Sequence, residues 1–263
     1  MWRRPILLGR DRSRALETVN AFFTYRESEL TVGLRIAVIS DIHSNLDALR
    51  TVVATLPAYD QLLCLGDIVG YGAEPNGVIE ELQHLNPEVV LMGNHDYAVA
   101  TGDTAGFSPH AALAVEWTRG KIERERLRYL SQLRPSMKLE SDTVTLGLFH
   151  GSPEDPLTEY IFPGIPYNEA RQIIHKGGAR LVLLGHTHIP MIYSFVDEML
   201  ANPGSVGQPR DGDPRASFGI LTILDGKFSF EVKRVTYDVD SAASKIIEAR
   251  LPSFLADRLY TGM

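Results

Sequence analysis

The sequence predicts an α/β fold built on a mostly parallel sheet, and three observations support this prediction. From Leu34 onward, apolar runs of strand length alternate with segments of helical periodicity, as in successive βα units. The runs Ile36–Ile39, Val89–Met92 and Leu181–Leu184 are continuously apolar, which is typical of strands buried on both faces. No internal repeat or low-complexity tract interrupts the alternation. We therefore expect one compact domain over residues 34–263.

In the first half of the chain, three strands are each expected to lead into helical segments. A strand at Arg35–Ser40 precedes a helix that begins at Asn45 and ends before Pro57, with its apolar side chains on one face. Proline suits the first turn of a helix, so the next helix begins near Pro75. The other elements expected before residue 134 are strands at Gln61–Leu65 and Glu88–Met92 and helices at about Pro109–Arg119 and Ile122–Leu133.

The second half of the chain predicts mainly strands. Asp225-Gly226 between two alternating runs is typical of a hairpin turn, so strands near Phe218–Leu224 and Phe228–Val235 should pair antiparallel. The residues from Asp240 predict a short terminal helix. The other expected elements are strands near Met137–Glu140, Thr143–Phe149, Leu181–Leu184, Met191–Phe195 and Met199–Ala201 and a helix near Tyr167–His175.

Composition and charge exclude several classes of protein. Hydrophobic residues make up 44% of the chain and charged residues 22%, which is typical of a globular fold. The single cysteine, Cys64, excludes an intrachain disulfide framework and a cysteine zinc cluster, and it fits a reducing compartment. The net charge of -7 disfavours a stable nucleic-acid complex, and no apolar run approaches the roughly 18 residues of a membrane span. We expect a cytoplasmic protein that binds no membrane.

Residues Met1–Gly33 differ from the rest of the chain. They carry several arginines, and their apolar run Ile6–Leu8 is shorter than the 7 to about 15 residues of a secretory signal. We expect a poorly ordered extension that the domain does not need for folding. The sequence leaves open whether this extension belongs to the native protein.

The residues that follow the apolar runs are nearly all of types that bind metal ions. In an open α/β sheet, ligands bind outside the carboxyl ends of the strands. A single Asp-x-His or His-x-His pair is weak evidence, but the recurrence of metal-binding residue types at five strand ends predicts a metal site. His84, His110 and His175 fall on predicted helices and are interpreted as surface or packing residues. The candidates at the strand ends are Asp41, His43, Asp67, Asn94, His95, Asp96, His150, His186 and His188.

From Arg35 to about Val235 the chain resembles the calcineurin-like metallophosphoesterase superfamily. The resemblance implies a four-layer α/β/β/α sandwich around two mixed β-sheets. The motifs that carry it are Asp41-x-His43, Gly66-Asp67, Gly93-Asn94-His95-Asp96, His150 and Gly185-His186-Thr187-His188. Two further segments resemble the small bacterial and archaeal phosphodiesterase branch, namely Asn202-Pro203-Gly204-Ser205 and Gln208-Pro209-Arg210.

The resemblance also implies two divalent transition metals bound to the protein. Mixed imidazole and carboxylate ligands suit Mn, Fe, Ni or Zn, and the choice among them stays open. Asp67 would bridge the two metals, with one carboxylate oxygen for each. The ligands implied for the first metal are Asp41, His43 and His188, and those for the second are Asn94, His150 and His186.

Such a site would hydrolyse a phosphoester by in-line attack of a hydroxide that bridges the metals. His95 is the candidate general acid for the leaving alkoxide, and Asp96 would help to orient it. The alternative role for His95 is that of a simple hydrogen-bonding residue. Arg210 is the candidate substrate-binding group because a guanidinium matches phosphate geometry, the alternative being a solvated loop arginine.

The favoured function is therefore a phosphodiesterase for a small nucleotide or related phosphodiester. The segment Asp67–Gly72 lacks the arginine that protein phosphatases and symmetric dinucleoside-tetraphosphate hydrolases of this resemblance carry there, which disfavours both activities. An asymmetric dinucleoside-polyphosphate hydrolase and a phosphomonoesterase remain alternatives. A non-catalytic metal-binding scaffold is the alternative of another class, and the presence of His95 and of every ligand disfavours it. The expected partner is a small phosphorylated substrate, and self-association stays open.

Overall fold

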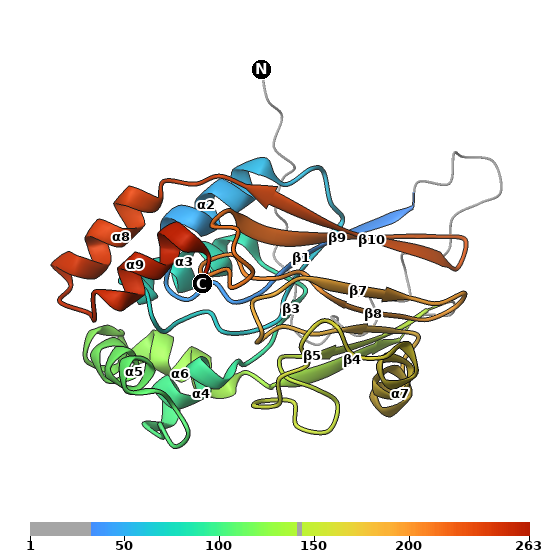
Figure 1. Cartoon of the computed structure of the whole chain (residues 1–263), viewed down its shortest axis with the longest axis horizontal. Helices are drawn as coiled ribbons and strands as arrows, with labels where there is room; N and C mark the ends of the chain where they lie inside the picture. Colours follow the sequence, from blue (N-terminus) through green and yellow to red (C-terminus); the bar gives the residue numbers. More distant parts are fainter. Residues whose placement is uncertain (1–32, 141–143) are drawn as a thin grey trace.

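Two five-stranded sheets pack face to face and are covered by helices on both outer sides (Figure 1). The computed structural model of the chain describes residues 33–140 and 144–263. The expected extension therefore lies outside the described residues, except for Gly33. Within them, the order of layers is helices, sheet, sheet and helix, which confirms the four-layer fold with two mixed sheets.

The first sheet has the strand order β10-β9-β1-β2-β3. Strands β1 to β3 run parallel, whereas β9 pairs antiparallel with both β1 and β10. The turn between β9 and β10 holds Asp225 and Gly226 at φ 50° and 71°, so the predicted hairpin is confirmed. The strands are β1 (Leu34–Ile39), β2 (Gln61–Cys64), β3 (Val89–Val90), β9 (Ala216–Leu224) and β10 (Lys227–Val235).

The second sheet has the strand order β4-β5-β6-β8-β7. Its three central strands β5, β6 and β8 run parallel, and the edge strands β4 and β7 pair antiparallel with their neighbours. The start expected for β5, at residue 143, lies outside the described residues. The strands are β4 (Ser136–Glu140), β5 (Thr145–Phe149), β6 (Leu181–Leu183), β7 (Met191–Ser194) and β8 (Met199–Asn202).

Alternate residues of the central strands fill different layers of the core. Ile36 and Val38 of β1 belong to the apolar cluster between the two sheets, while Ile39 belongs to the cluster under the helices. In β6, Leu181 faces the first sheet and Val182 packs against the helix on the outer face. Because both faces of these strands are covered, their apolar runs are continuous, as the sequence indicated.

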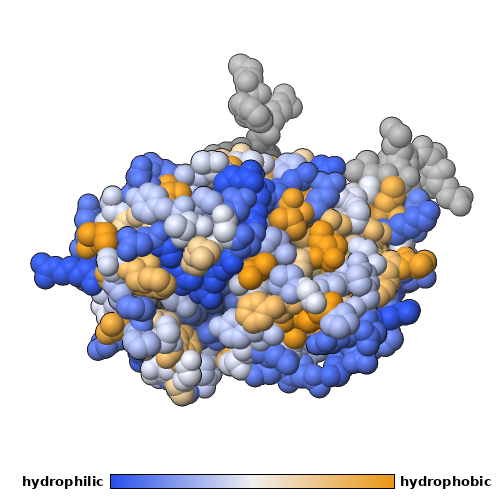
Figure 2. All heavy atoms as spheres, in the orientation of Figure 1, coloured by the Kyte–Doolittle hydropathy of each residue, from blue (hydrophilic) through white to orange (hydrophobic). Residues whose placement is uncertain are grey.

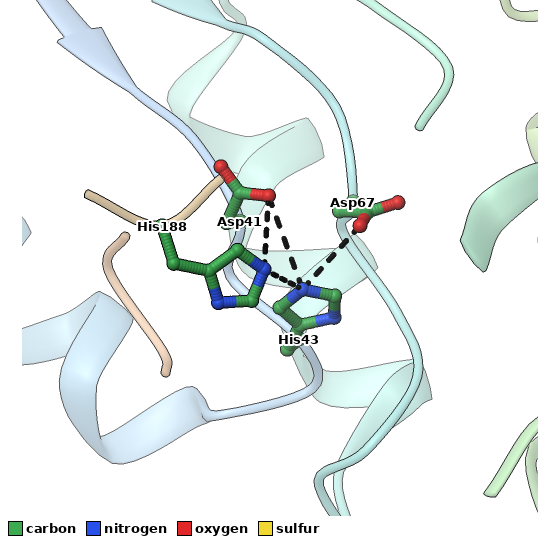
Figure 3. A group of neighbouring side chains, drawn as sticks. All are labelled: Asp41, His43, Asp67 and His188. Atoms are coloured by element: carbon green, nitrogen blue, oxygen red, sulfur yellow. Dashed lines mark hydrogen bonds and ion pairs between the residues drawn. The ribbon is translucent and has the colours of Figure 1, made fainter. Parts of the chain in front are cut away.

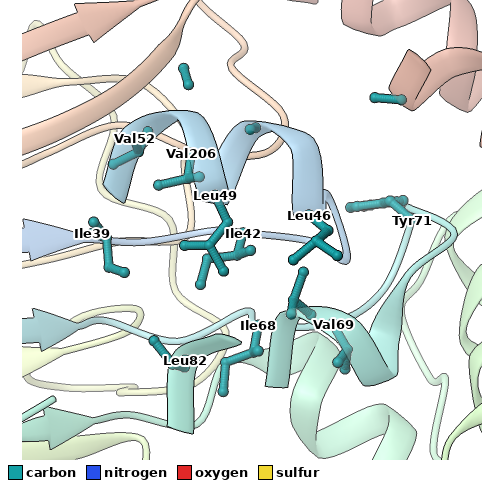
Figure 4. Packing of buried hydrophobic residues seen from close by; sticks show 14 of the residues in the cluster. Ile39, Ile42, Leu46, Leu49, Val52, Ile68, Val69, Tyr71, Leu82 and Val206 are labelled. Carbon is teal, nitrogen blue, oxygen red and sulfur yellow. The ribbon is translucent and has the colours of Figure 1, made fainter. Parts of the chain in front are cut away.

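Most helices cover the first sheet, and α7 covers the second. Figure 4 shows Leu46, Leu49 and Val52 of α2 packed above Ile39 and Ile42. The helices are α2 (Leu46–Thr55), α3 (Pro75–Leu85), α4 (Asn94–Thr101), α5 (Pro109–Lys121), α6 (Arg124–Gln132), α7 (Tyr167–Gly177), α8 (Val239–Glu248) and α9 (Phe254–Thr261). No helix within residues 33–140 and 144–263 is long and apolar enough to cross a membrane.

Two parts of the helical prediction are wrong. The structure places the helix α4 directly after Gly93, where the sequence shows no amphipathic period because its buried residues include the polar His95 and Asp96. The C-terminal segment forms the two helices α8 and α9 in place of one. Arg250 adopts φ 58° between them and Pro252 follows, so the chain turns and α9 packs back on α8.

Candidate metal centre

The predicted metal ligands come from strand ends of both sheets and meet in one place. Asp41 and His43 follow β1, and Asp67 follows β2. The second sheet contributes three histidines, and Asn94 opens α4. All of these side chains are buried except Asn94, which is half-buried. The residues from the second sheet are His150 after β5 and His186 and His188 after β6.

These side chains form two groups that share Asp67. In the first group, the ligand atoms of Asp41, His43, Asp67 and His188 all lie within 4.8 Å of one another (Figure 3). In the second group, the ligand atoms of Asp67, His150 and His186 do the same. Asn94 Oδ1 lies 3.2 Å from His150 Nε2, so the amide adjoins the second group.

A single oxygen of Asp67 faces both groups. Asp67 Oδ2 lies 3.4 Å from His43 Nε2 and 3.5 Å from His150 Nε2. The other oxygen, Oδ1, accepts a hydrogen bond from the backbone N–H of His95 at 2.8 Å. The sequence predicted one oxygen of Asp67 for each metal, but in the structure the same oxygen faces both groups. The other oxygen is occupied by the hydrogen bond from the His95 backbone.

Backbone carbonyls orient the imidazole rings as metal ligands require. His43 Nδ1 lies 3.1 Å from Val69 O, and His150 Nδ1 lies 2.8 Å from Leu65 O. His188 Nδ1 contacts the carbonyl of Gln208 in the same way. A carbonyl only accepts, so each of these Nδ1 atoms carries a proton and Nε2 is the atom that each ring presents to the centre.

His186 is turned the other way round. Its Nε2 lies 3.1 Å from Thr158 O, so Nδ1 is the atom left to face the second group. The ring of Tyr160 stacks on His186 with a centroid distance of 3.7 Å and an interplanar angle of 25°. The loop before α7 therefore fixes the orientation of His186.

The first group contains polar atoms that lack a partner within the protein. Asp41 Oδ2 accepts a hydrogen bond from the His186 backbone N–H at 3.2 Å, but the buried Oδ1 has no hydrogen-bond partner in the described part of the chain. That oxygen lies 3.3 Å from His188 Nε2, and His188 Nε2 lies 3.0 Å from His43 Nε2. An unpartnered carboxylate oxygen and two imidazole lone pairs directed at the same space fit a divalent cation.

The pKa values of these groups differ strongly because they are buried next to one another. Burial raises the pKa of Asp41 to about 7 and holds the pKa of His43 and of His188 well below the usual range. Burial also opposes the charge on Asp67, but His150, His95 and His43 outweigh it and lower the pKa of Asp67. In return, Asp67 outweighs the effect of burial on His150 and raises the pKa of His150 to about 9. The imidazoles of the first group are thus neutral at pH 7, as metal ligands must be.

The backbone is strained at most of the candidate ligands. Non-glycine residues rarely adopt positive φ, and each such residue costs on the order of 1–3 kcal/mol where the surroundings enforce it. Hydrogen bonds between the loops hold this conformation, among them Asp41 N–H to Gly66 O and His43 N–H to Asp67 O, both at 3.0 Å. The candidate ligands with φ between 47° and 66° are Asp41, His43, Asp67, His186 and His188.

The segment from Asn202 to Ser205 supports the ligand loops from behind. The Asn202 amide donates to Gly185 O at 2.7 Å and to Thr187 Oγ1 at 3.1 Å, which ties down the loop that carries His186 and His188. The Ser205 hydroxyl donates to Asp41 O at 2.7 Å. This motif therefore positions ligands and does not itself enter either group.

His95 lies beside the first group and is almost completely buried. Its ring centroid is 4.9 Å from that of His43, 4.3 Å from that of Tyr71 and 4.8 Å from that of Phe107. Its Nδ1 has no hydrogen-bond partner in the described part of the chain. Burial lowers the pKa of His95 to about 4, although the nearby Asp67 acts in the opposite direction.

The hydrogen bonds that Asp96 accepts in the described residues come from backbone N–H groups and none comes from the ring of His95, so they do not support the orienting role expected for Asp96. Its Oδ1 accepts the backbone N–H groups of Ile68 at 2.9 Å and Val69 at 3.1 Å, and its Oδ2 accepts that of Gly93 at 2.9 Å. Burial raises the pKa of Asp96 to about 7. All of its hydrogen bonds therefore hold the backbone of the loops on either side of Asp67.

Arg210 lies next to the centre, with its backbone N–H donating to His188 O at 3.3 Å, and is half-buried. Its Nη2 donates to Gln208 Oε1 at 2.9 Å, and its guanidinium lies 5.5 Å from the centroid of the Tyr71 ring. Its Nε is buried and has no partner within the described residues.

Three residues that the sequence did not indicate also lie at the centre or beside it, namely Tyr71, Tyr160 and Arg258. Tyr71 stands four residues after Asp67, so its place in that loop was a usable signal. Tyr160 and Arg258 lie far from the motifs in sequence, and no pattern in the chain points to them. Only the fold brings them to the site.

The four-layer sandwich with two overlapping Asp and His groups at its strand ends defines a metal-dependent hydrolase of phosphoric esters. Residues 34–226 match the family described as the calcineurin-like phosphoesterase superfamily domain. The chain belongs to this superfamily.

Three similar proteins illustrate the relationship. An uncharacterised protein of Methanocaldococcus jannaschii is 38% identical over 86% of this chain and 98% of its own length. The phosphodiesterase YfcE of Escherichia coli is 26% identical over 72% of this chain and 87% of its own length. The crystal structure of a metallophosphoesterase from Sphaerobacter thermophilus superimposes with a TM-score of 0.75 at 34% identity, and covers 88% of this chain and 100% of that protein.

Proposed function

We propose that the protein is a phosphodiesterase that uses two divalent transition metals to hydrolyse a small nucleotide or a related phosphodiester. The observation that carries the proposal is the single buried oxygen of Asp67 that faces both groups of ligands. A carboxylate shared in this way suits a pair of cations, and paired cations are the recurrent solution for in-line displacement at phosphorus. The similarity to a protein named phosphodiesterase supports the choice of a diester.

In this proposal, each side chain at the centre has a defined task. Two bound cations would polarise the phosphoryl oxygens and make a coordinated water more acidic. The first cation would be held by Asp41, His43 and His188. The second would be held by His150, His186 and Asn94, and Asp67 would bind both. Backbone carbonyls keep the imidazole rings in the tautomer that binds a cation, so the ligands need little rearrangement.

The leaving alkoxide needs a proton, and His95 is the residue we assign to supply it. Its ring lies against those of His43 and Tyr71, so packing holds the side chain beside the metal ligands, and its buried Nδ1 has no partner in the described part of the chain. An approaching phosphate would favour the imidazolium form, because a nearby anion stabilises a cationic ring. Arg210, with its unpartnered Nε, is the residue we assign to a phosphoryl oxygen.

A panel of phosphoesters tests the proposal. The protein, reconstituted separately with Mn, Fe, Ni and Zn, is assayed with bis(p-nitrophenyl) phosphate, p-nitrophenyl phosphate, a cyclic nucleotide and a dinucleoside polyphosphate. We expect a phosphodiester to be the preferred substrate and Asp67→Asn to abolish its turnover. The matched control Asp103→Asn changes an exposed aspartate of the same charge and should behave as the wild type.

Three results would contradict the proposal in different ways. Faster turnover of the monoester would identify a phosphomonoesterase. Hydrolysis of the dinucleoside polyphosphate without that of simple diesters would favour the asymmetric hydrolase. Protein that carries two metals per chain and cleaves none of the four compounds would favour the non-catalytic scaffold.

A further inference from the structure

Two arginines from distant parts of the chain converge beside the metal centre. Arg210 follows β8, while Arg258 belongs to the C-terminal helix α9. Their guanidinium groups lie 5.5 Å and 6.0 Å from the centroid of the same ring, that of Tyr71. The Tyr71 ring in turn lies 4.7 Å from the ring of His43 and 4.3 Å from that of His95. Both guanidinium groups and two imidazoles of the centre therefore lie around one aromatic ring.

The fold fixes this arrangement through the backbone. Gly212 N–H donates to Gly262 O at 2.8 Å, which joins the loop of Arg210 to the end of α9. Gly262 adopts φ 64° and packs directly against the backbone of Asp213. Figure 2 shows strongly hydrophilic side chains around the place where Figure 1 marks the C-terminus, beside this junction. Both arginines are half-buried, so their positions are defined while a ligand can still reach them.

The two guanidinium groups have no acidic side chain as a partner. Within residues 33–140 and 144–263, no aspartate or glutamate forms an ion pair with Arg210 or Arg258. The half-buried Arg126 and Arg234, by contrast, each pair with an acidic side chain. Arg258 donates through its Nε to an oxygen of Met263, the last residue of the sequence and therefore a carboxylate, and its guanidinium lies over the Phe254 ring. Its two terminal nitrogens have no hydrogen-bond partner in the described part of the chain.

The positive charges of Arg210 and Arg258 repel each other when no anion lies between them. Burial, with a further contribution from Arg210, lowers the pKa of Arg258 to about 10. Two half-buried like charges with free donors repel each other, and an anion that binds both would relieve this repulsion. Guanidinium groups match the oxygens of a phosphoryl group in geometry as well as in charge.

We propose that Arg258 forms a subsite for a second phosphoryl group, one that the substrate carries in addition to the phosphate that is cleaved, and that Arg210 contacts both groups. The inference rests on the proposed function, which places the scissile phosphate at the metal groups. It narrows the substrate class to phosphodiesters that carry a second phosphoryl group, such as a nucleotide diester with a further phosphate. Arg258 then determines specificity and takes no part in the bond cleavage itself.

Calorimetric titration of the metal-loaded protein with AMP and with ADP tests this proposal. The two ligands share the adenosine group and differ in one phosphoryl group, so the ratio of their affinities reports on the subsite alone. Free metal is kept in excess and the metal content is measured after each titration, because ADP chelates cations. We expect ADP to bind more tightly than AMP. We expect Arg258→Ala to reduce that ratio by about ten-fold or more, which is typical of a lost hydrogen bond to a charged group.

The control Arg128→Ala removes the same charge from an exposed position on α6 and should preserve the ratio. If Arg258→Ala does not fold, Arg258→Gln keeps the size of the side chain and serves the same purpose. The proposal is overturned if the wild type binds ADP no more tightly than AMP, or if the Arg258 variant weakens both ligands equally. Because binding needs no turnover, a protein that discriminates through Arg258 but cleaves no diester would overturn only the proposed function.

Discussion

Replacement of Asp96 by Asn separates two roles for this residue, support of the Asp67 loop and orientation of His95. Asp96 is completely buried and accepts three backbone N–H groups, from Ile68, Val69 and Gly93. Asn keeps the shape and one acceptor oxygen, but its amide nitrogen is a donor. If Oδ1 keeps its place, that nitrogen faces the N–H of Gly93, and the contact becomes one of donor against donor.

The expected cost follows from these three contacts. A buried N–H without a partner costs about 1–3 kcal/mol. Above the pKa of Asp96, about 7, the bonds to Ile68 and Val69 also weaken because the neutral amide replaces a carboxylate. We expect Asp96→Asn to lower the free energy of unfolding by about 2–4 kcal/mol. For a chain of this size, that corresponds to a fall in Tm of roughly 5 to 15 °C.

Thermal and urea unfolding of the metal-free protein measure the loss, and elemental analysis measures the metal content of the reconstituted variant. Because the loop carries Asp67, we expect metal occupancy and turnover to fall together. Asp103→Asn, at an exposed position just beyond α4, is the matched control and should change the stability by no more than about 0.5 kcal/mol. An Asp96 variant with unchanged stability and full metal content but reduced kcat would refute the reasoning and restore the role beside His95.

Four further outcomes are expected. Asp67→Asn should lower metal occupancy of both groups, and elemental analysis that finds two metals per chain at normal turnover would contradict the shared role. His95→Ala should retain its metals but lose about 10²- to 10⁴-fold in turnover of an alkyl diester, with a smaller loss for a p-nitrophenyl diester; equal losses would argue against proton donation. Gly93→Ala should displace the Asp67 carboxylate, since a Cβ there would overlap Oδ1, and metal affinity that stays at the wild-type value would disprove this. A chelator should abolish turnover and lower Tm, and an added divalent metal should restore both, because a ligand that binds only the native state stabilises it; a Tm insensitive to chelation would exclude metals bound at this centre.

The candidate ligands could be predicted from the sequence because each follows an apolar run that is typical of a buried strand. Asp41, Asp67, His150 and His186 each stand just after a continuous apolar run, and such runs end at the same edge of a sheet. Local periodicity also identified α2 and the β9–β10 hairpin, since each depends on residues close together in sequence. The sequence alone therefore predicts features of two kinds: polar residues at strand ends, and elements formed by residues close together in the chain.

Tertiary structure alone decided the features that depend on distant segments. Helix α4 has no amphipathic period, because its buried face consists partly of His95 and Asp96, which serve the neighbouring loops. The hydrogen bonds of Asp96 reach Ile68, 28 residues away, so its role in support of the Asp67 loop could not be inferred from its place beside His95. Likewise, Tyr71 meets Arg258 only because α9 folds back over the first sheet. Contacts of this kind depend on how distant elements pack against each other, and the residues that make them share no periodic pattern in the sequence.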